Sequence, residues 1–288
     1  MQIDGERVLD FHTHVFPTEV VQARERYFAN EPWFQSLYAA PQSRLATADD
    51  LAQAMDRDSI AAAVALNFGW RDPGLCRETN DSILEALRPY RQIVPFCAVV
   101  PGEPGAAQEI ARCAALGFRG VGELNADGQG FDITDERTMQ PVIQACQDHG
   151  MVLLLHASEP VGHGYPGKGE ATPEKLAHFL TMAQEVSIVL AHWGGGLAFY
   201  ELMPEIGSLA VNSYYDTAAT PYLYSPQIYR IGSQLVGSRV LFGSDYPLMS
   251  QRRALKHLEE AQLSAEERRT LLWDNGARLL GLDESERE

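Results

Sequence analysis

The chain has 288 residues, of which 45% are hydrophobic and 22% are charged, a balance typical of a soluble globular protein. Its formal net charge of −16 disfavours phosphate backbones and anionic surfaces, and no apolar run approaches the roughly 20 residues that span a bilayer, so we expect neither nucleic acid nor membrane as a partner. Met1–Glu6 lacks the pattern of a signal peptide and the four cysteines form no CxxC pair, which predicts free thiols in a cytoplasmic protein.

Short apolar runs alternate with helical patterns along the chain. Most of these runs are apolar at nearly every position, which is typical of parallel strands covered on both faces. We predict strands over Val8–His14, Ile60–Phe68, Ile93–Val100, Phe118–Leu124, Met151–His156, Ser187–His192, Leu209–Tyr215 and Val240–Asp245.

The segments between the runs carry apolar residues at three- and four-residue spacing, which predicts helices. Gly117 and Gly150 lie where a helix end needs a left-handed residue, and Thr172-Pro173 supplies an N-cap followed by a first-turn proline. We predict helices over Ala48–Arg57, Arg77–Arg88, Ala106–Leu116, Thr138–His149, Pro173–Glu185, Leu197–Ile206, Pro226–Leu235, Ser250–Ala261 and Ala265–Leu280.

The alternation favours a single α/β domain over residues 1–288, a closed (β/α)8 barrel, and its alternative is a doubly wound sheet. No repeat, low-complexity tract or linker separates a second domain. The stretch from about 15 to 47 is too long for an ordinary loop, and we expect it to form an insertion over the carboxyl-terminal face of the barrel.

Residues that bind metals stand where several predicted strands end. His12 and His14 lie two apart on the first strand, so their side chains point to the same side. His156, His192 and Asp245 end the fifth, sixth and eighth strands. Because the carboxyl ends of barrel strands surround one pocket, we expect these residues to meet there. A set of imidazoles with a carboxylate suits zinc, with manganese or iron as alternatives.

With these motifs the chain resembles the amidohydrolase superfamily. It is most similar to the amidohydrolase-related branch, which includes aminocarboxymuconate-semialdehyde decarboxylase and several lactonases. The resemblance covers nearly the whole chain and rests on Asp10–His14, Ala191–Gly195, Phe242–Pro247 and Asn275–Leu282.

The resemblance implies a TIM barrel of the metal-dependent hydrolase type, in which His12, His14, His156 and Asp245 hold the metal. It also implies that Asp245 takes a proton from metal-bound water and that His192 orients this water or polarises the substrate. The chemistry is sound by itself, because a bound divalent cation lowers the pKa of its water from 15.7 towards roughly 7.

Glu123, at the end of the fourth predicted strand, leaves the number of metal ions open. Relatives with two metals use a carboxylate at this place as a bridge, and a bridging Glu123 would move His156 and His192 onto a second ion. The other interpretation is that Glu123 hydrogen-bonds to a ligand without touching the metal. We expect direct coordination, with one ion or two.

The glycine- and proline-rich segment Ala157–Gly169 predicts a shaped loop beside the pocket. The alternatives are a solvated loop and, for the aromatic residues near the pocket, plain packing. The candidate contacts for an anionic, cyclic or aromatic substrate are His163, Tyr165, Lys168, Arg71 (paired with Lys168 as a carboxylate clamp), Trp70, Trp193, Tyr214, Tyr215 and Asp216.

These features predict hydrolysis of a C–O or C–N bond in a small carboxylated molecule, a lactone or an amide, by metal-activated water. The main alternative is a non-oxidative decarboxylase (a carboxy-lyase), in which the metal binds the substrate instead. Further alternatives are a phosphodiesterase or DNase-like hydrolase, which the acidic surface disfavours, and a non-catalytic metal-binding barrel. The resemblance makes a homo-oligomer reasonable.

Overall fold

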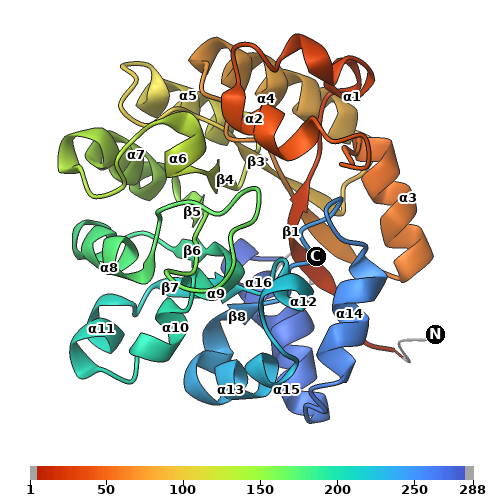
Figure 1. The fold of residues 1–288 in the computed structure, drawn as a ribbon, viewed down its shortest axis with the longest axis vertical. Helices are drawn as coiled ribbons and strands as arrows, with labels where there is room; N and C mark the ends of the chain where they lie inside the picture. The colour runs from red at the N-terminus through yellow and green to blue at the C-terminus, as the bar shows by residue number, and fades with distance from the viewer. Residues whose placement is uncertain (1–4, 283–288) are drawn as a thin grey trace.

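Eight parallel strands, each hydrogen-bonded to the next along the chain, form one sheet that curls into a barrel (Figure 1). The strands are β1 (Leu9–His14), β2 (Ala62–Leu66), β3 (Ile93–Cys97), β4 (Gly120–Leu124), β5 (Val152–Leu155), β6 (Ile188–Leu190), β7 (Ser213–Asp216) and β8 (Val240–Leu241). This computed structural model describes residues 5–282, so the prediction drawn from Met1–Glu6 rests partly on residues outside it. The predicted (β/α)8 barrel is confirmed, and the doubly wound alternative is wrong.

The seam between β8 and β1 is irregular. It contains one isolated parallel bridge, between Thr13 and Tyr246, because β8 is only two residues long. Backbone hydrogen bonds complete the closure: Phe11 N donates to Phe242 O over 2.7 Å, and Asp245 N donates to His12 O over 2.9 Å. The segment after β8 therefore closes the ring in place of a longer strand.

The longer helices between the strands lie on the outside of the barrel (Figure 1). Thr47 and Asp50 form a capping box at the start of α3, and Asp72 caps α4. The predicted helix Leu197–Ile206 is divided in two because Pro204 begins a new helix. The helices are α3 (Ala48–Asp58), α4 (Pro73–Leu87), α5 (Ala106–Ala115), α6 (Ala126–Gln129), α7 (Glu136–His149), α8 (Pro173–Met182), α9 (Ala191–Gly194), α10 (Leu197–Tyr200), α11 (Pro204–Leu209), α12 (Thr220–Leu223), α13 (Gln227–Val236), α14 (Gln251–Glu259), α15 (Ala265–Arg269) and α16 (Asn275–Leu280).

The barrel interior, as we call the buried cluster of alternate strand residues, is apolar. Phe96 occupies the space over Gly120, where a Cβ atom would lie 2.3 Å from the phenyl ring. A π-helical turn over Thr270–Asp274 joins α15 to α16 and contributes to the same cluster. The buried members are Leu9, Phe11, Ala62, Val64, Leu66, Val94, Phe96, Val152, Leu154, Val189, Ala191, Leu241, Trp273, Ala277 and Leu280.

Residues 15–47 contain α1 (Thr18–Gln22), a 3-10 turn over Arg24–Arg26, and α2 (Pro32–Tyr38). The ring of Phe34 on α2 packs against that of Trp70, which follows β2, with centroids 4.9 Å apart. Glu31 accepts hydrogen bonds from the backbone of the same β2–α4 loop. These contacts fit an insertion over the carboxyl-terminal face, which stays our interpretation of the domain.

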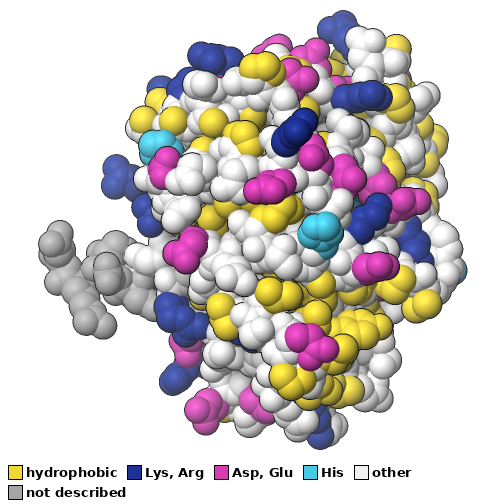
Figure 2. Space-filling view, turned by 90° about the vertical axis from the view of Figure 1, so that its left-hand side faces the viewer, with side chains coloured by type: hydrophobic (Ala, Val, Ile, Leu, Met, Phe, Trp, Pro, Cys, Tyr) yellow, Lys and Arg dark blue, Asp and Glu magenta, His cyan; other side chains and the backbone are white. Residues whose placement is uncertain are grey.

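The four cysteines are buried free thiols, as their sequence pattern predicts. Acidic and basic side chains are interspersed with hydrophobic ones on the face that carries α7 and α8 (Figure 2). Within residues 5–282 no helix combines the length and apolar character needed to cross a membrane.

Candidate metal centre

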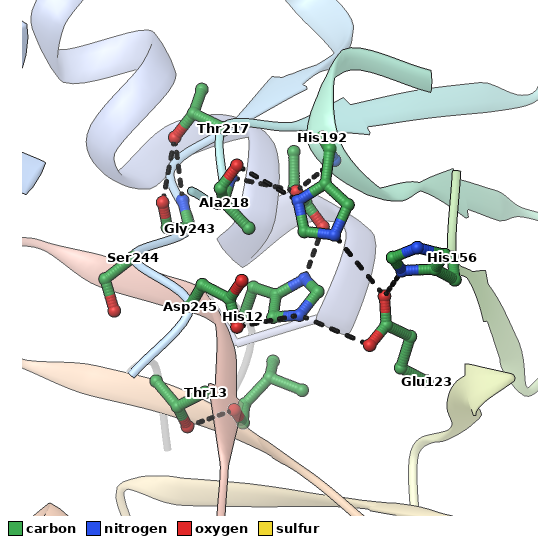
Figure 3. A network of polar contacts seen from close by, with 12 residues as sticks. His12, Thr13, Glu123, His156, His192, Thr217, Ala218, Gly243, Ser244 and Asp245 are labelled. Carbon is green, nitrogen blue, oxygen red and sulfur yellow. Dashed lines mark hydrogen bonds and ion pairs between the residues drawn. The ribbon is translucent and has the colours of Figure 1, made fainter. Parts of the chain in front are cut away.

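Two groups of metal-binding side chains lie side by side at the carboxyl ends of the strands. Figure 3 shows how His12 and Asp245 of the first group lie beside Glu123, His156 and His192 of the second. The first consists of His12 and His14 from β1 with Asp245 from the segment after β8, and all three are buried. The second consists of Glu123 on β4, His156 after β5 and His192 after β6. Within each group the candidate ligand atoms lie within 4.8 Å of one another. The structure thus brings all six predicted ligands together, but it groups His156 with Glu123 and His192.

Two of these residues, His192 and Asp245, have left-handed backbone, which sets the direction of their side chains. β6 ends at Leu190, and His192 (φ 56°) and the following tryptophan (φ 61°) lie in a tight turn rather than on the strand. Asp245 has φ 68° and lies in the segment after β8. The predicted strands Ser187–His192 and Val240–Asp245 are therefore too long. Positive φ at non-glycine residues is uncommon and concentrates at functional sites.

Glu123 faces both groups. Its Oε2 atom lies 3.5 Å from His14 Nε2, whereas its Oε1 atom lies 2.9 Å from His156 Nδ1 and 3.7 Å from His192 Nε2. In the first group His12 Nε2 and His14 Nε2 are 3.2 Å apart. Asp245 Oδ1 lies 3.6 Å from His14 Nε2 and 3.8 Å from His12 Nε2. One carboxylate therefore offers one oxygen to each group.

The spacing of these atoms fits a metal site, because ligands bound at about 2.1 Å to one ion lie roughly 3.0–3.5 Å apart. The ring hydrogen bonds fit as well, since in three imidazoles one nitrogen contacts an oxygen outside the cluster and the other nitrogen faces the cluster. This is the arrangement that fixes metal-binding histidines. The outer contacts are His12 Nδ1 to Asp216 Oδ2 (2.8 Å), His156 Nε2 to Gly167 O (3.0 Å) and His192 Nδ1 to Ala218 O (3.1 Å).

The buried carboxylates make this region attract positive charge. Burial opposes charge on His12, but the carboxylates of Asp216 and Glu123 outweigh it and raise its pKa to about 10. For His192, burial is outweighed by the hydrogen bond to Glu123 and by nearby carboxylates, and its pKa rises to about 9. Burial and the neighbouring His12 lower the pKa of His14. A divalent cation would satisfy the same field.

A cavity of about 540 Å³ opens over the cluster and includes His14, Glu123, His156, His192 and Asp245 in its lining. Its walls are largely apolar. They include Trp33, Leu37 and Tyr38 of α2, together with Phe68, Leu223 and Leu248. Within the described part of the chain, Arg44 is the one Lys or Arg side chain in this lining.

The loop after β5 contributes two of its three predicted contacts to the cavity. His163 and Tyr165 line it, and the Tyr165 hydroxyl donates to Glu159 Oε2 over 2.8 Å. Lys168 lies outside the lining, because its Nζ donates to the backbone oxygens of Val161 and His163 and so closes the loop on itself. Arg71 is exposed and also outside the lining, so the structure does not form the predicted carboxylate clamp.

The other predicted contacts lie outside the cavity lining, and among them Trp70 is fully buried while Tyr214 packs against the barrel interior. Trp193 is fully buried under α13, where its Nε1 donates to Thr220 Oγ1 over 2.9 Å, because the left-handed turn directs it away from the cavity. Tyr215 is fully buried and its hydroxyl donates to a glutamate 2.6 Å away. Asp216 accepts hydrogen bonds from His12 Nδ1, His192 N and Ala218 N. It therefore orients metal-binding side chains and does not line the cavity.

Sequence reasoning missed Arg44 and Tyr38 as cavity residues. Both lie in the segment predicted to cover the barrel, and neither stands at a strand end, so no ligand spacing marks them. The signal available was their place in the insertion, since side chains of a segment over the carboxyl-terminal face lie close to the pocket.

Comparison with known proteins places these features in context. A family model described as "Amidohydrolase" matches residues 9–282, and no curated protein matches the chain. Among solved structures, 5-carboxyvanillate decarboxylase LigW from Sphingomonas paucimobilis shows 17% identity and a TM-score of 0.79 over 96% of this chain and 99% of that chain. The 5-carboxyvanillate decarboxylase from Novosphingobium aromaticivorans, complexed with manganese and 4-hydroxy-3-methoxy-5-nitrobenzoic acid, shows 18% identity and a TM-score of 0.76 over 96% of each chain.

A hydrolase is also among the similar structures. A probable 2-pyrone-4,6-dicarboxylic acid hydrolase from Acinetobacter baumannii, with citric acid bound, shows 18% identity and a TM-score of 0.65 over 96% of this chain and 99% of that chain. At such identities these structures show a shared fold. The choice between the reactions therefore depends on the site of this chain.

Proposed function

The chain belongs to the amidohydrolase family of enzymes, and we propose that it is a divalent-metal-dependent decarboxylase of a small aromatic or cyclic carboxylic acid. The observation that carries the proposal is the largely apolar cavity over a cation-attracting cluster, with Arg44 in its lining. Of the reactions that the sequence left open, decarboxylation is better supported than hydrolysis. Several proteins whose structures share this fold are decarboxylases, which also supports decarboxylation.

The first requirement is to hold the carboxylate and the ring. Arg44 binds an anionic group of the substrate, because a guanidinium matches a carboxylate in geometry and charge. Trp33, Leu37 and Phe68 pack against the ring. These apolar walls exclude water, and a desolvated carboxylate is disfavoured relative to neutral carbon dioxide.

The second requirement is to stabilise the electron pair left on carbon. When bound, a divalent ion held by His12, His14, Asp245 and Glu123 supplies a Lewis acid that stabilises negative charge on the substrate. The bond between the ring carbon and the carboxyl carbon breaks, and its electron pair stays on the ring carbon. His192 delivers a proton from Nε2 to that carbon, carbon dioxide leaves, and solvent returns the proton to His192. His192 is suited to this role because Ala218 O and Asp216 hold its Nδ1 and backbone N–H.

The ligands leave the identity of the metal open. Imidazole and carboxylate donors suit zinc, manganese and iron, so the predicted zinc and its two alternatives stay predictions. A cytoplasmic location and a homo-oligomeric state likewise stay predictions.

Hydrolysis of a lactone or an amide is the second candidate, and one observation favours it. Glu123 presents one oxygen to each ligand group, so the two groups would hold two ions, and these would supply an activated water as the nucleophile. In that reaction Asp245 takes the proton of the attacking water.

The test is to load the purified protein with manganese or zinc and to incubate it with hydroxybenzoates and carboxylated lactones in ¹⁸O-water. Mass spectrometry then follows carbon dioxide release and ¹⁸O incorporation. We expect release of carbon dioxide and a product without ¹⁸O. Arg44→Met should raise KM about tenfold or more, while Arg71→Met, outside the cavity, should leave it unchanged. A product carrying ¹⁸O without carbon dioxide would assign the hydrolase instead.

A further inference from the structure

We propose that Asp10 is a positioning residue that holds the segment bearing Asp245 against β1 and so sets the spacing of the first ligand group. The inference rests on the metal centre of the proposed function, whatever the substrate is. Asp10 lies two residues before His12, and it belongs to neither ligand group.

The carboxylate of Asp10 is fully buried and joins three segments of the chain. Its Oδ1 accepts hydrogen bonds from Ser244 N over 2.9 Å and from His12 N over 3.3 Å. Its Oδ2 accepts from Ser244 Oγ over 2.6 Å and from Gln251 Nε2 over 2.9 Å. Four donors from β1, the segment after β8 and the first turn of α14 thus meet on one side chain.

The place of these contacts matters because they lie on the irregular seam of the barrel. β8 is two residues long, and past it the seam has one isolated bridge and the backbone hydrogen bonds from Asp245 N to His12 O and from His14 N to Tyr246 O in place of a regular ladder. The side-chain contacts of Asp10 add to these few backbone bonds in fixing the position of Asp245. Ser244 immediately precedes Asp245, and its Oγ also accepts from the backbone N–H of Tyr246 over 3.1 Å. Asp10 and Ser244 together therefore hold the chain on both sides of this ligand.

The physical consequence is a fixed distance between ligands from two strands. Asp245 Oδ1 lies 3.6 Å from His14 Nε2, and a shift of the segment after β8 would change this distance directly. Hydrogen bonds to a buried carboxylate are charge-assisted and hence strong. Partners that orient ligands typically change metal affinity by about 10- to 100-fold when they are replaced.

A matched control is available in Asp58. Its carboxylate is also buried and also contacts α14, where it accepts from Arg252 N over 3.3 Å and pairs with the Arg252 side chain over 3.1 Å. Asp58 ends α3 and has no contact with Ser244 or with the ligand groups among its described partners. Asp58 is therefore buried and hydrogen-bonded to α14, as Asp10 is, but it does not contact the seam between β8 and β1.

The experiment measures manganese and zinc dissociation constants by competition with a chromophoric chelator, together with urea unfolding in EDTA. The proteins are wild type, Asp10→Asn, Asp58→Asn and the double variant Asp10→Asn/Gln251→Glu. We expect Asp10→Asn to weaken metal binding about 10- to 100-fold. Asp58→Asn should lower the free energy of unfolding and leave the dissociation constant within about twofold of wild type.

The double variant should recover part of the lost affinity, because the introduced carboxylate at position 251 accepts from the introduced amide at position 10. If Asp10→Asn folds poorly, Ser244→Ala takes its place as the test variant. It removes one of the four donors to Asp10, and we expect metal binding to weaken only several-fold. Metal binding by Asp10→Asn equal to wild type, or an equal loss in Asp58→Asn, would overturn the positioning role. A wild-type protein that binds neither metal would overturn the metal centre and this inference with it.

Discussion

The barrel interior and the metal centre use the same strands and opposite kinds of residue. Leu154 and Val189 are fully buried hydrocarbon, whereas His156 and His192, two and three residues further on, are buried imidazoles. Leu154 and Val189 lie on regular strands, while His192 and Asp245 have left-handed backbone. Residues that stabilise the fold and residues that bind the metal thus occupy different positions along the same strands. We therefore expect a substitution in the interior to change the free energy of unfolding without changing metal affinity, and one at the metal centre to do the reverse.

The largest expected effect tests the interior. Phe96→Ala removes a fully buried ring that fills the space over Gly120 and packs edge-on to Phe11 with centroids 6.0 Å apart. We expect the free energy of unfolding to fall by about 3–5 kcal/mol, because the cavity adds to the lost transfer free energy. Urea unfolding measures this, with Leu116→Ala at an exposed site as the control. Metal affinity should stay within about twofold of wild type, and a parallel loss would mean that the two regions act as one unit.

The next effect tests the metal centre. Asp216 is fully buried and accepts from His12 Nδ1 over 2.8 Å, from His192 N over 3.0 Å and from Ala218 N over 3.0 Å. Asp216→Asn should weaken metal binding by about 10- to 100-fold, because the His12 ring loses its charged partner. The free energy of unfolding without metal should fall by less than in Phe96→Ala. Chelator competition and urea unfolding measure the two quantities, and the reverse order of effects would contradict the separation.

The same separation explains what the sequence predicted. Strands buried on both faces carry a continuous apolar signal, so β2, β3 and β5 lie inside the predicted ranges. The six predicted ligands lie at strand ends, where the barrel topology alone brings them together. The backbone conformation of His192 and Asp245 could not be predicted from the sequence, because their left-handed turns depend on tertiary contacts.

Loop residues were harder to predict because their direction depends on packing across the chain. Lys168 bonds within its own loop, and Trp193 turns under α13, although both follow strands that end at the site. Arg44 lines the cavity from residues 15–47, some thirty residues after the nearest predicted ligand. Asp216 was placed at the right strand end but given the wrong contact, since no pattern distinguishes a carboxylate beside a ligand from one beside a substrate.

The smallest effect uses a buried carboxylate that serves the fold alone. Burial opposes charge on Glu109, but hydrogen bonds from Arg112 at 2.7 and 2.8 Å and from Asn80 at 3.0 Å lower its pKa below 4.5. A lowered pKa in the folded state means that Glu109 stabilises the protein fully above about pH 4.5, and that this contribution is lost as the pH falls through the folded value. Glu109→Gln should therefore lower the free energy of unfolding by about 1 kcal/mol at pH 7.

Urea unfolding at a series of pH values measures this effect. The difference in free energy of unfolding between Glu109→Gln and wild type should become smaller below pH 4.5. Unchanged metal affinity at pH 7 would separate this carboxylate from Asp216, whereas a gap independent of pH would mean that packing, rather than charge, accounts for Glu109.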